Sequence, residues 1–113
     1  MIDFCVLGSG IAGSSIARSL SKKYTVEVFD KARGPGGRAS NKRLKAKLTF
    51  DHGVQYISPK SIEFQNFITS LYNKKILTLW DGNHLDFSFK NEINKAKYIG
   101  RKANNDICKY QLK

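Results

Sequence analysis

The order of apolar and polar residues is clearest at the start of the chain, over residues 4–29. Residues 4–7 form a short, continuous apolar run, which is typical of a parallel strand covered on both faces. Apolar residues then recur at helical spacing over residues 11–20, and residues 25–29 have the pattern of a second strand. The pattern predicts a strand, a helix and a second strand, which together form one βαβ unit of a parallel sheet.

The rest of the chain alternates between basic, helical and strand-like segments. Residues 39–47 are polar and basic, and we expect them to loop out. Apolar residues at helical spacing predict a helix over residues 62–72, with Ser58 as its N-cap and Pro59 in its first turn. We expect short strands over residues 48–50, 76–80, 85–89 and 98–100, a turn over residues 81–83 and a short helix over residues 106–112. Apolar side chains on the longer helix and in the final turn predict exposed, adhesive surfaces.

A glycine-rich loop joins the first strand to the first helix, with glycines at positions 8, 10 and 13. Gly8 permits a tight turn after the strand, Gly10 leaves room for a diphosphate beside the backbone, and Gly13 lets the helix pack close to the strand. The N–H groups at the start of the helix, including those of Ile11 and Ala12, are expected to hold the diphosphate. A strand, this loop and a helix in that order predict a dinucleotide site.

An acidic residue and a second glycine-rich turn follow the second strand. Asp30 lies about 20 residues beyond the glycine loop, where a carboxylate can accept hydrogen bonds from both hydroxyl groups of an adenosine ribose. The turn over residues 33–38 ends in Gly37 and Arg38, which suit close backbone approach and a charge-assisted bond to phosphate. The carboxylate disfavours a 2′-phosphate, although the neighbouring Lys31 leaves room for one. A nicotinamide site has no need of this second turn, whereas an extended FAD is held at its diphosphate from two sides.

Several of these residues, together with the segment from Phe50 to Ile57, resemble the N-terminal part of flavin-dependent enzymes of the amine-oxidase type. Among those enzymes, the chain is similar in particular to the renalase-like FAD oxidoreductases. The other matching positions are Gly8, Gly10, Gly13, Ala17, Asp30, Gly36, Gly37 and Arg38. The similarity covers most of this chain, which corresponds only to the first part of such an enzyme.

The resemblance implies an α/β fold that opens with the βαβ unit of a Rossmann-type FAD-binding domain and continues into part of an α+β substrate region. Residues 1–58 would carry the FAD-binding or dinucleotide-binding segment with its second phosphate loop, and residues 59–113 a partial substrate domain packed against it as one unit. The resemblance also implies that Gln55 and Tyr56 contact the cofactor. FAD is the expected cofactor, and hydride would pass to it from a reduced nicotinamide or an amine-like substrate. No catalytic side chain is nominated.

Two other interpretations stay open. The glycine loop also suits a Rossmann module that binds NAD or NADP without flavin. The short length suits a non-enzymatic remnant or a small interaction protein. Under the FAD interpretation the chain is truncated relative to the enzymes that it resembles, so we expect it to be catalytically incomplete alone. A second polypeptide or an oligomer would then complete the fold.

Composition sets further limits on function. The 113 residues include 20 basic and 9 acidic side chains, which give a net charge of +11. That charge would suit nucleic acid or an anionic surface, but the lysines are scattered along the sequence, which favours compositional bias over a nucleic-acid-binding face. Cys5 and Cys108 lack metal-ligand or redox spacing, which favours reduced thiols in the cytoplasm, with Cys5 as a small buried side chain. We expect no metal site, secretory signal or membrane-spanning segment.

Overall fold

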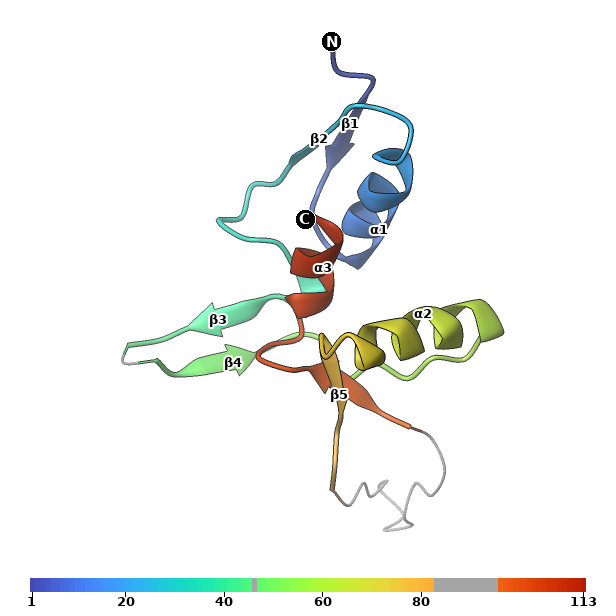
Figure 1. The fold of residues 1–113 in the computed structure, drawn as a ribbon. Coiled ribbons are helices and arrows are strands. Elements are labelled where there is room, and N and C mark those ends of the chain that lie inside the picture. Colours follow the sequence, from blue (N-terminus) through green and yellow to red (C-terminus); the bar gives the residue numbers. More distant parts are fainter. Residues whose placement is uncertain (46, 83–95) are drawn as a thin grey trace.

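The chain begins with two parallel strands joined by a helix, as the apolar pattern predicts. The protein is described by a computed structural model over residues 1–45, 47–82 and 96–113. Strand β1 (Phe4–Leu7) pairs in parallel with β2 (Val26–Phe29), and α1 (Ile11–Leu20) connects the two strands (Figure 1). The α1 helix contacts both strands, so the three elements form one βαβ unit of an α/β fold.

One face of this two-stranded sheet is covered and the other is open. Val6 and Val28 lie opposite each other in the register and are half-buried on the face that α1 covers. Leu7 and Phe29 form a pair on the other face, where they are 82% and 52% exposed. Cys5 is exposed as well. The expectation of a strand covered on both faces, with Cys5 buried, is therefore wrong for the part of the chain that the structure describes, because α1 covers only one face.

After β2 the chain forms a glycine-rich turn, a short 3₁₀ helix (Gly37–Ala39) and a hairpin. The hairpin pairs β3 (Asn41–Arg43) with β4 (Thr49–Asp51) in antiparallel register. The expectation that this basic segment loops out is wrong where β3 forms. The backbone of β3 pairs with β4 there, and the Nδ2 of Asn41 donates to Oδ1 of Asp51 (3.1 Å).

Among the described residues the longest helix is α2 (Ile62–Asn73), which confirms the helix predicted from the spacing of its apolar residues. Its N-cap is Ser61, whose side-chain oxygen accepts a hydrogen bond from the backbone N–H of Phe64 (3.2 Å). The expectation that Ser58 caps the helix and Pro59 opens it is therefore wrong. A second serine stands three residues later in the sequence, and its extended backbone directs its hydroxyl at the free N–H groups of the first turn.

A second, antiparallel strand pair and a short helix follow α2. Strand β5 (Leu77–Leu79) pairs with β6 (Tyr98–Gly100), and α3 (Asp106–Gln111) ends the described chain except for its last two residues. The strand at residues 98–100 and the final helix confirm two of the sequence-based expectations. The expected strand over residues 85–89 lies outside the described residues.

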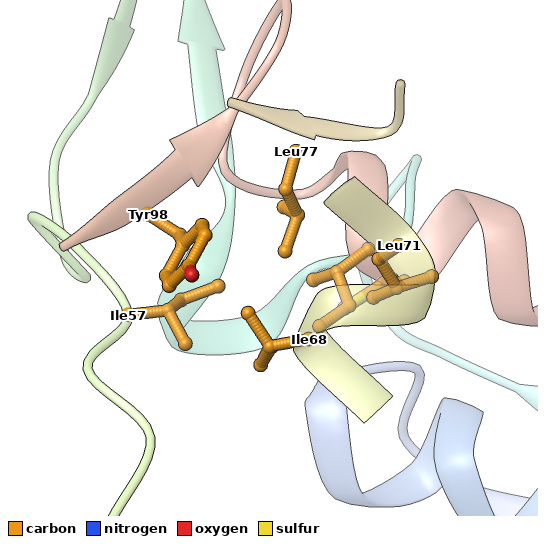
Figure 2. Packing of buried hydrophobic residues seen from close by; sticks show 7 residues of the cluster. Ile57, Ile68, Leu71, Leu77 and Tyr98 are labelled. Atoms are coloured by element: carbon orange, nitrogen blue, oxygen red, sulfur yellow. The ribbon is translucent and has the colours of Figure 1, made fainter. Parts of the chain in front are cut away.

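The apolar core lies among the elements of the second half of the chain, where α2, β5, β6 and α3 meet (Figure 2). Its most buried side chains are at most 1% exposed, and they are Ile68, Leu71, Leu77, Ile107 and Cys108. The core cluster consists of Ile57, Ile68, Leu71, Leu77, Tyr98, Ile107 and Cys108. Figure 2 shows Ile57 and Tyr98 on one side of this cluster and Leu71 on the other, with Ile68 between them.

The α3 helix packs on α1 and so connects the two halves of the chain (Figure 1). Gln111 donates through Nε2 to the hydroxyl of the buried Ser14 (3.4 Å), and Ile107 is fully buried. The expectation of an exposed apolar surface in this final turn is therefore wrong at Ile107, although Leu112 is 37% exposed. On α2, Ile62 is 77% exposed, as expected. Among the described residues, no helix has the length and apolar character needed to cross a membrane.

Candidate functional site

The two glycine-rich loops, which lie far apart in the sequence, meet at the N-terminus of α1. Gly36 donates its N–H to the carbonyl oxygen of Ser9 (3.0 Å), and Gly10 and Gly36 form an isolated parallel bridge. Gly37 has φ of +53°, and a Cβ built on it would lie 3.2 Å from the Cα of Gly10. Glycine at position 37 is therefore favoured both by its backbone conformation and by the close contact of the two loops.

Gly13 lets α1 lie against the first loop. A Cβ built on Gly13 would lie 2.0 Å from the carbonyl oxygen of Gly8, a distance that no side chain can adopt without moving the backbone. Gly8 itself has φ of +97°, which glycine adopts without steric strain. The sequence-based roles of these two glycines, a tight turn and close packing of helix on strand, thus have direct counterparts in the geometry.

A cavity of about 510 Å³ opens where the loops meet. Seven of the residues predicted to bind the cofactor line it, namely Gly8, Gly10, Ile11, Ala12, Gly13, Gly37 and Arg38. The remaining lining residues are Leu7, Gly36, Ala39 and Val54. Gly36 belongs to the predicted second glycine-rich turn, whereas the other three were not among the predicted cofactor contacts. The size of the cavity falls within the usual range of about 300–1,000 Å³ for small-molecule pockets.

The start of α1 faces this cavity, and no acidic side chain of its own first turn neutralises the positive end of the helix. The N-cap, Gly10, makes no side-chain capping bond, and the first turn of α1 contains no acidic residue. The N–H groups of a first helical turn have no partner within the helix, and the helix dipole makes that end positive. Arg38, which is exposed at the edge of the second loop, adds a full positive charge to the cavity. The arrangement can bind an anionic group such as a diphosphate.

Asp30 lies directly after β2 and is connected to the first loop through Ser9. Its Oδ2 accepts hydrogen bonds from the N–H and the hydroxyl of Ser9 (both 2.6 Å), and its Oδ1 accepts one from the N–H of Ala32 (2.8 Å). These bonds, that of the Ser9 hydroxyl first, lower the pKa of Asp30 from 3.8 to about 2. Asp30 is therefore an exposed, ionised carboxylate at neutral pH. It is outside the residues that line the cavity, as is the exposed Lys31 next to it.

Gln55 and Tyr56 also lie outside the lining of the cavity. Gln55 is exposed, and its carbonyl oxygen accepts a hydrogen bond from the side chain of Asn104 (3.2 Å). The ring of Tyr56 packs on that of Trp80, with 5.6 Å between ring centres, and the Nζ of Lys97 lies 4.8 Å from the Tyr56 ring centre. From this segment, the residue that reaches the cavity is Val54, held by a backbone hydrogen bond from its N–H to the carbonyl of Arg38 (2.9 Å).

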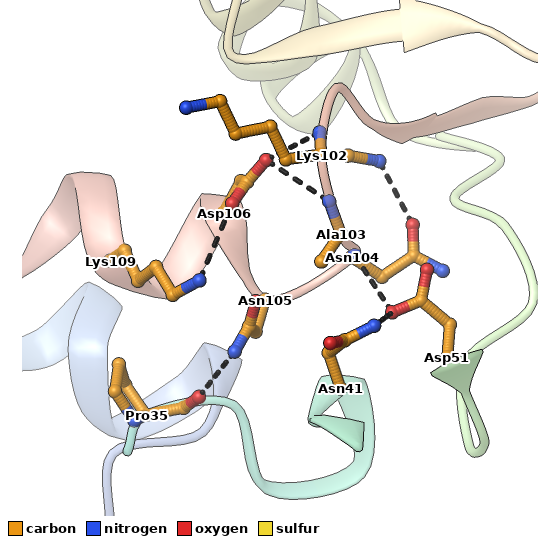
Figure 3. A network of polar contacts seen from close by, with 10 residues as sticks. Pro35, Asn41, Asp51, Lys102, Ala103, Asn104, Asn105, Asp106 and Lys109 are labelled. Carbon is orange, nitrogen blue, oxygen red and sulfur yellow. Dashed lines mark hydrogen bonds and ion pairs between the residues drawn. The ribbon is translucent and has the colours of Figure 1, made fainter. Parts of the chain in front are cut away.

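Two asparagines near the end of the chain, Asn104 and Asn105, form hydrogen bonds with segments that lead into the lining of the cavity (Figure 3). Asn105 donates through Nδ2 to the carbonyl of Pro35 (3.1 Å), and its Oδ1 is buried with no hydrogen-bond partner among the described residues. Asn104 donates to the carbonyl of Val54 (2.7 Å), and its own N–H donates to Asp51 (3.1 Å). The sequence contains no local signal for this role, because the partners lie 50 to 70 positions away.

The described residues contain no group of three or more His, Cys, Asp or Glu side chains that could hold a metal ion. His52 is exposed and its Nε2 lies 3.2 Å from the Ser40 hydroxyl. The polar groups at the site are the backbone N–H groups of the α1 N-terminus, Arg38 and, beside the first loop, the Asp30 carboxylate. Such groups can bind a nucleotide.

The glycine loops, the uncapped helix and the following acid define a dinucleotide-binding Rossmann-like unit. In agreement, the model of the NAD(P)-binding Rossmann-like domain family matches residues 6–75. The chain belongs to this family.

The chain is also similar to individual proteins, and the solved structures among them share its fold. The uncharacterized protein MJ1450 of Methanocaldococcus jannaschii is 32% identical over 53 residues, which are 47% of this chain and 14% of that protein. Among solved structures, wild-type putrescine oxidase bound to putrescine is 21% identical and has a TM-score of 0.56, with 88% of this chain and 22% of that chain covered. A double mutant from a redesign of cofactor binding in putrescine oxidase has the same TM-score and is 22% identical, with the same coverage. The chain thus spans less than a quarter of the length of each of these proteins.

Proposed function

We propose that this chain binds FAD as the N-terminal cofactor-binding part of an oxidoreductase of the amine-oxidase type, similar to the renalase-like enzymes. The observation that carries the proposal is the joining of two glycine-rich loops around one cavity. A site for NAD or NADP needs only the first loop, whereas a site that holds the diphosphate of an extended FAD from two sides uses both loops. The fold shared with putrescine oxidase supports this choice.

The diphosphate of the cofactor would lie at the N-terminus of α1. Gly10 and Gly37 leave the two backbones free of side chains there, so phosphate oxygens can reach the N–H groups of Ile11 and Ala12. Arg38 would form a charge-assisted hydrogen bond with a phosphate oxygen from the opposite loop. The residues present therefore fit an anionic dinucleotide.

Asp30 would hold the ribose of the adenosine half. A carboxylate has about four acceptor positions, and Asp30 uses three of them within the chain. A ribose with two free hydroxyls would therefore replace the Ser9 hydroxyl at Oδ2, while the backbone N–H of Ser9 keeps the carboxylate in place. Lys31 lies beside this position, and Gln55 and Tyr56 are proposed to approach the flavin end of the cofactor.

The bound flavin would supply the redox chemistry by accepting hydride from a reduced nicotinamide or an amine-like substrate. The residues of this chain bind and orient its adenosine and diphosphate groups. We propose that residues 1–58 perform that task and that residues 59–113 belong to the substrate side, with a further polypeptide or a second copy completing the enclosure. The two free cysteines agree with a proposed location in the cytoplasm.

The second candidate is a module that binds NAD or NADP without flavin. The family description favours it, since the matched family is named for NAD(P) binding. Against NADP stands the ionised Asp30, which would repel a 2′-phosphate.

Equilibrium titration of the full chain with FAD, NAD and NADP distinguishes these candidates. We expect FAD to bind most tightly and NADP least tightly. Gly10→Val, which places a branched side chain in the cavity, should abolish binding, whereas Lys60→Ala, at an exposed position outside the cavity, should leave it unchanged. Tighter binding of NADP than of FAD would overturn the flavin proposal.

A further inference from the structure

A second pocket, which shares no lining residue with the glycine-lined cavity, collects basic side chains from separate parts of the chain. Its volume is about 400 Å³. Its basic residues come from the end of β3, the turn after α2, the loop after β6, and α3 with the residues beyond it. They are Arg43, Lys75, Arg101, Lys102, Lys109 and Lys113. We call the pocket that these residues line the basic pocket.

The enrichment of positive charge here exceeds what composition explains. Basic residues are 20 of the 113 in the chain, yet they are six of the nine that line this pocket. The glycine-lined cavity has one basic residue, Arg38, among its eleven lining residues. The basic residues are scattered along the sequence, but the fold brings six of them together at this pocket.

The one acidic side chain that lines the pocket, Asp106, neutralises little of this charge. The Oδ2 of Asp106 accepts hydrogen bonds from the N–H groups of Lys102 (2.8 Å) and Ala103 (3.2 Å), and its Oδ1 forms an ion pair with Lys109 (3.6 Å). Within the described ranges, no acidic side chain forms an ion pair with the other five cations. The pocket therefore keeps an excess of positive charge.

Further cations border the pocket at Tyr110, which is one of its lining residues. The Nζ of Lys74 donates to the Tyr110 hydroxyl (2.7 Å), and the Arg18 guanidinium lies 5.3 Å from the ring centre. The hydrogen bond from Lys74, followed by the charges of Lys74 and Arg18, lowers the pKa of the Tyr110 phenol. The positive field therefore extends over this rim of the pocket.

The backbone holds the pocket in shape independently of its basic side chains. The N–H of Arg101 donates to the carbonyl of Ile76 (3.0 Å), which fixes the loop after β6 against the turn after α2. Asp106 closes the same loop onto the start of α3 through its two backbone hydrogen bonds. Side chains at positions 101 and 102 can therefore be changed while these bonds stay.

We propose that the basic pocket binds a compact anion that carries two or more phosphate groups. Several cations converge on a space of small-molecule size, whereas a nucleic-acid strand needs a track of cations along an extended groove. This site is separate from the dinucleotide site and independent of its cofactor.

Titration calorimetry of the full chain with inorganic tripolyphosphate tests the proposal. The variant Arg101→Ala/Lys102→Ala should weaken binding by at least about tenfold, because each charge-assisted contact corresponds to about one factor of ten. The control variant Lys23→Ala/Lys60→Ala removes the same net charge at exposed positions outside the pocket and should change the affinity less than about twofold. Arg38→Ala removes the proposed phosphate contact of the glycine-lined cavity, and in that background Arg101→Ala/Lys102→Ala should still weaken binding by at least about tenfold.

Three results would overturn the proposal. Equal losses in the two double variants would show diffuse attraction by net charge, and affinity that the pocket variant leaves unchanged in the Arg38→Ala background would place the anion outside the basic pocket. A single-stranded oligonucleotide is tested as a competitor. If it displaces tripolyphosphate, and if the pocket variant lowers the oligonucleotide affinity as much as the tripolyphosphate affinity, the ligand is nucleic acid. Circular dichroism checks that each variant is folded, and Arg43→Gln, at an exposed residue of β3, replaces the double variant if that one unfolds.

Discussion

The two halves of the molecule differ in how they use their residues. The βαβ unit with its second glycine loop forms the candidate binding site, yet among buried apolar residues it contributes only Ala17 and Ala39 within the described ranges. The segment from Ile57 onward supplies the packed core. The comparison teaches that the loops which form the cavity depend on contacts with the other half, through α3 and the asparagines before it.

The largest effect should come from the core. Ile68→Ala removes a fully buried side chain, and the lost burial and the resulting cavity should lower the free energy of unfolding by about 2–5 kcal/mol. Leu7→Ala, on the open face of the β1–β2 sheet, should change it by less than about 0.5 kcal/mol, since Leu7 is 82% exposed. Urea denaturation of both variants measures the two values. Equal losses would show that the open face is covered in solution.

A smaller effect is expected where the helix meets the first loop. Gly13→Ala brings a Cβ to 2.0 Å from the Gly8 carbonyl oxygen, so the backbone must shift, at a loss of about 1–3 kcal/mol in stability. The displaced N–H groups should also weaken dinucleotide binding at least about tenfold. Gly34→Ala is the matched control, because a Cβ there meets nothing within 4 Å. Normal dinucleotide affinity in Gly13→Ala would place the site elsewhere.

The connection between the halves can be tested at Asn105. Asn105→Ala removes the hydrogen bond to the Pro35 carbonyl and should lower dinucleotide affinity about two- to tenfold, as a loss of about 0.5–1.5 kcal/mol predicts. The unfolding free energy should fall less than this bond alone suggests, because the substitution also removes the unpartnered Oδ1. Asn66→Ala, exposed on α2, serves as the control. If Asn105→Ala leaves the dinucleotide affinity unchanged, the second loop does not depend on the C-terminal segment for its binding conformation.

The smallest effect concerns the protonation of Asp30. Since its folded-state pKa is lowered to about 2, its contribution to stability is complete above pH 3.8 and is lost as the pH falls from there toward 2. Between pH 7 and 5 we therefore expect no change from this group. Ser9→Ala removes the largest cause of the shift, so the pKa of Asp30 should rise toward its usual value, as carboxyl-carbon NMR can measure. An unshifted titration in the wild-type chain would contradict the Ser9–Asp30 contact.

The sequence-based prediction was most accurate where the physical cause is local. The βαβ unit and the glycine loop followed from apolar spacing and from backbone positions that only glycine fits. It failed at the N-cap of α2, where Ser58 and Ser61 are both plausible caps, because the choice depends on the direction of the chain entering the helix. It also failed for Cys5, since burial of a strand depends on what packs on its second face.

The sequence by itself determined the class of this protein, because the spacing of glycines, apolar residues and Asp30 acts through steric limits and hydrogen bonds between near neighbours. Only the tertiary structure decided that Gly36 contacts Ser9, that Asn105 supports the second loop and that six cations form one pocket. Those contacts join residues up to 70 positions apart. Their geometry depends on how the helices and strands pack against one another, and no local pattern contains that information.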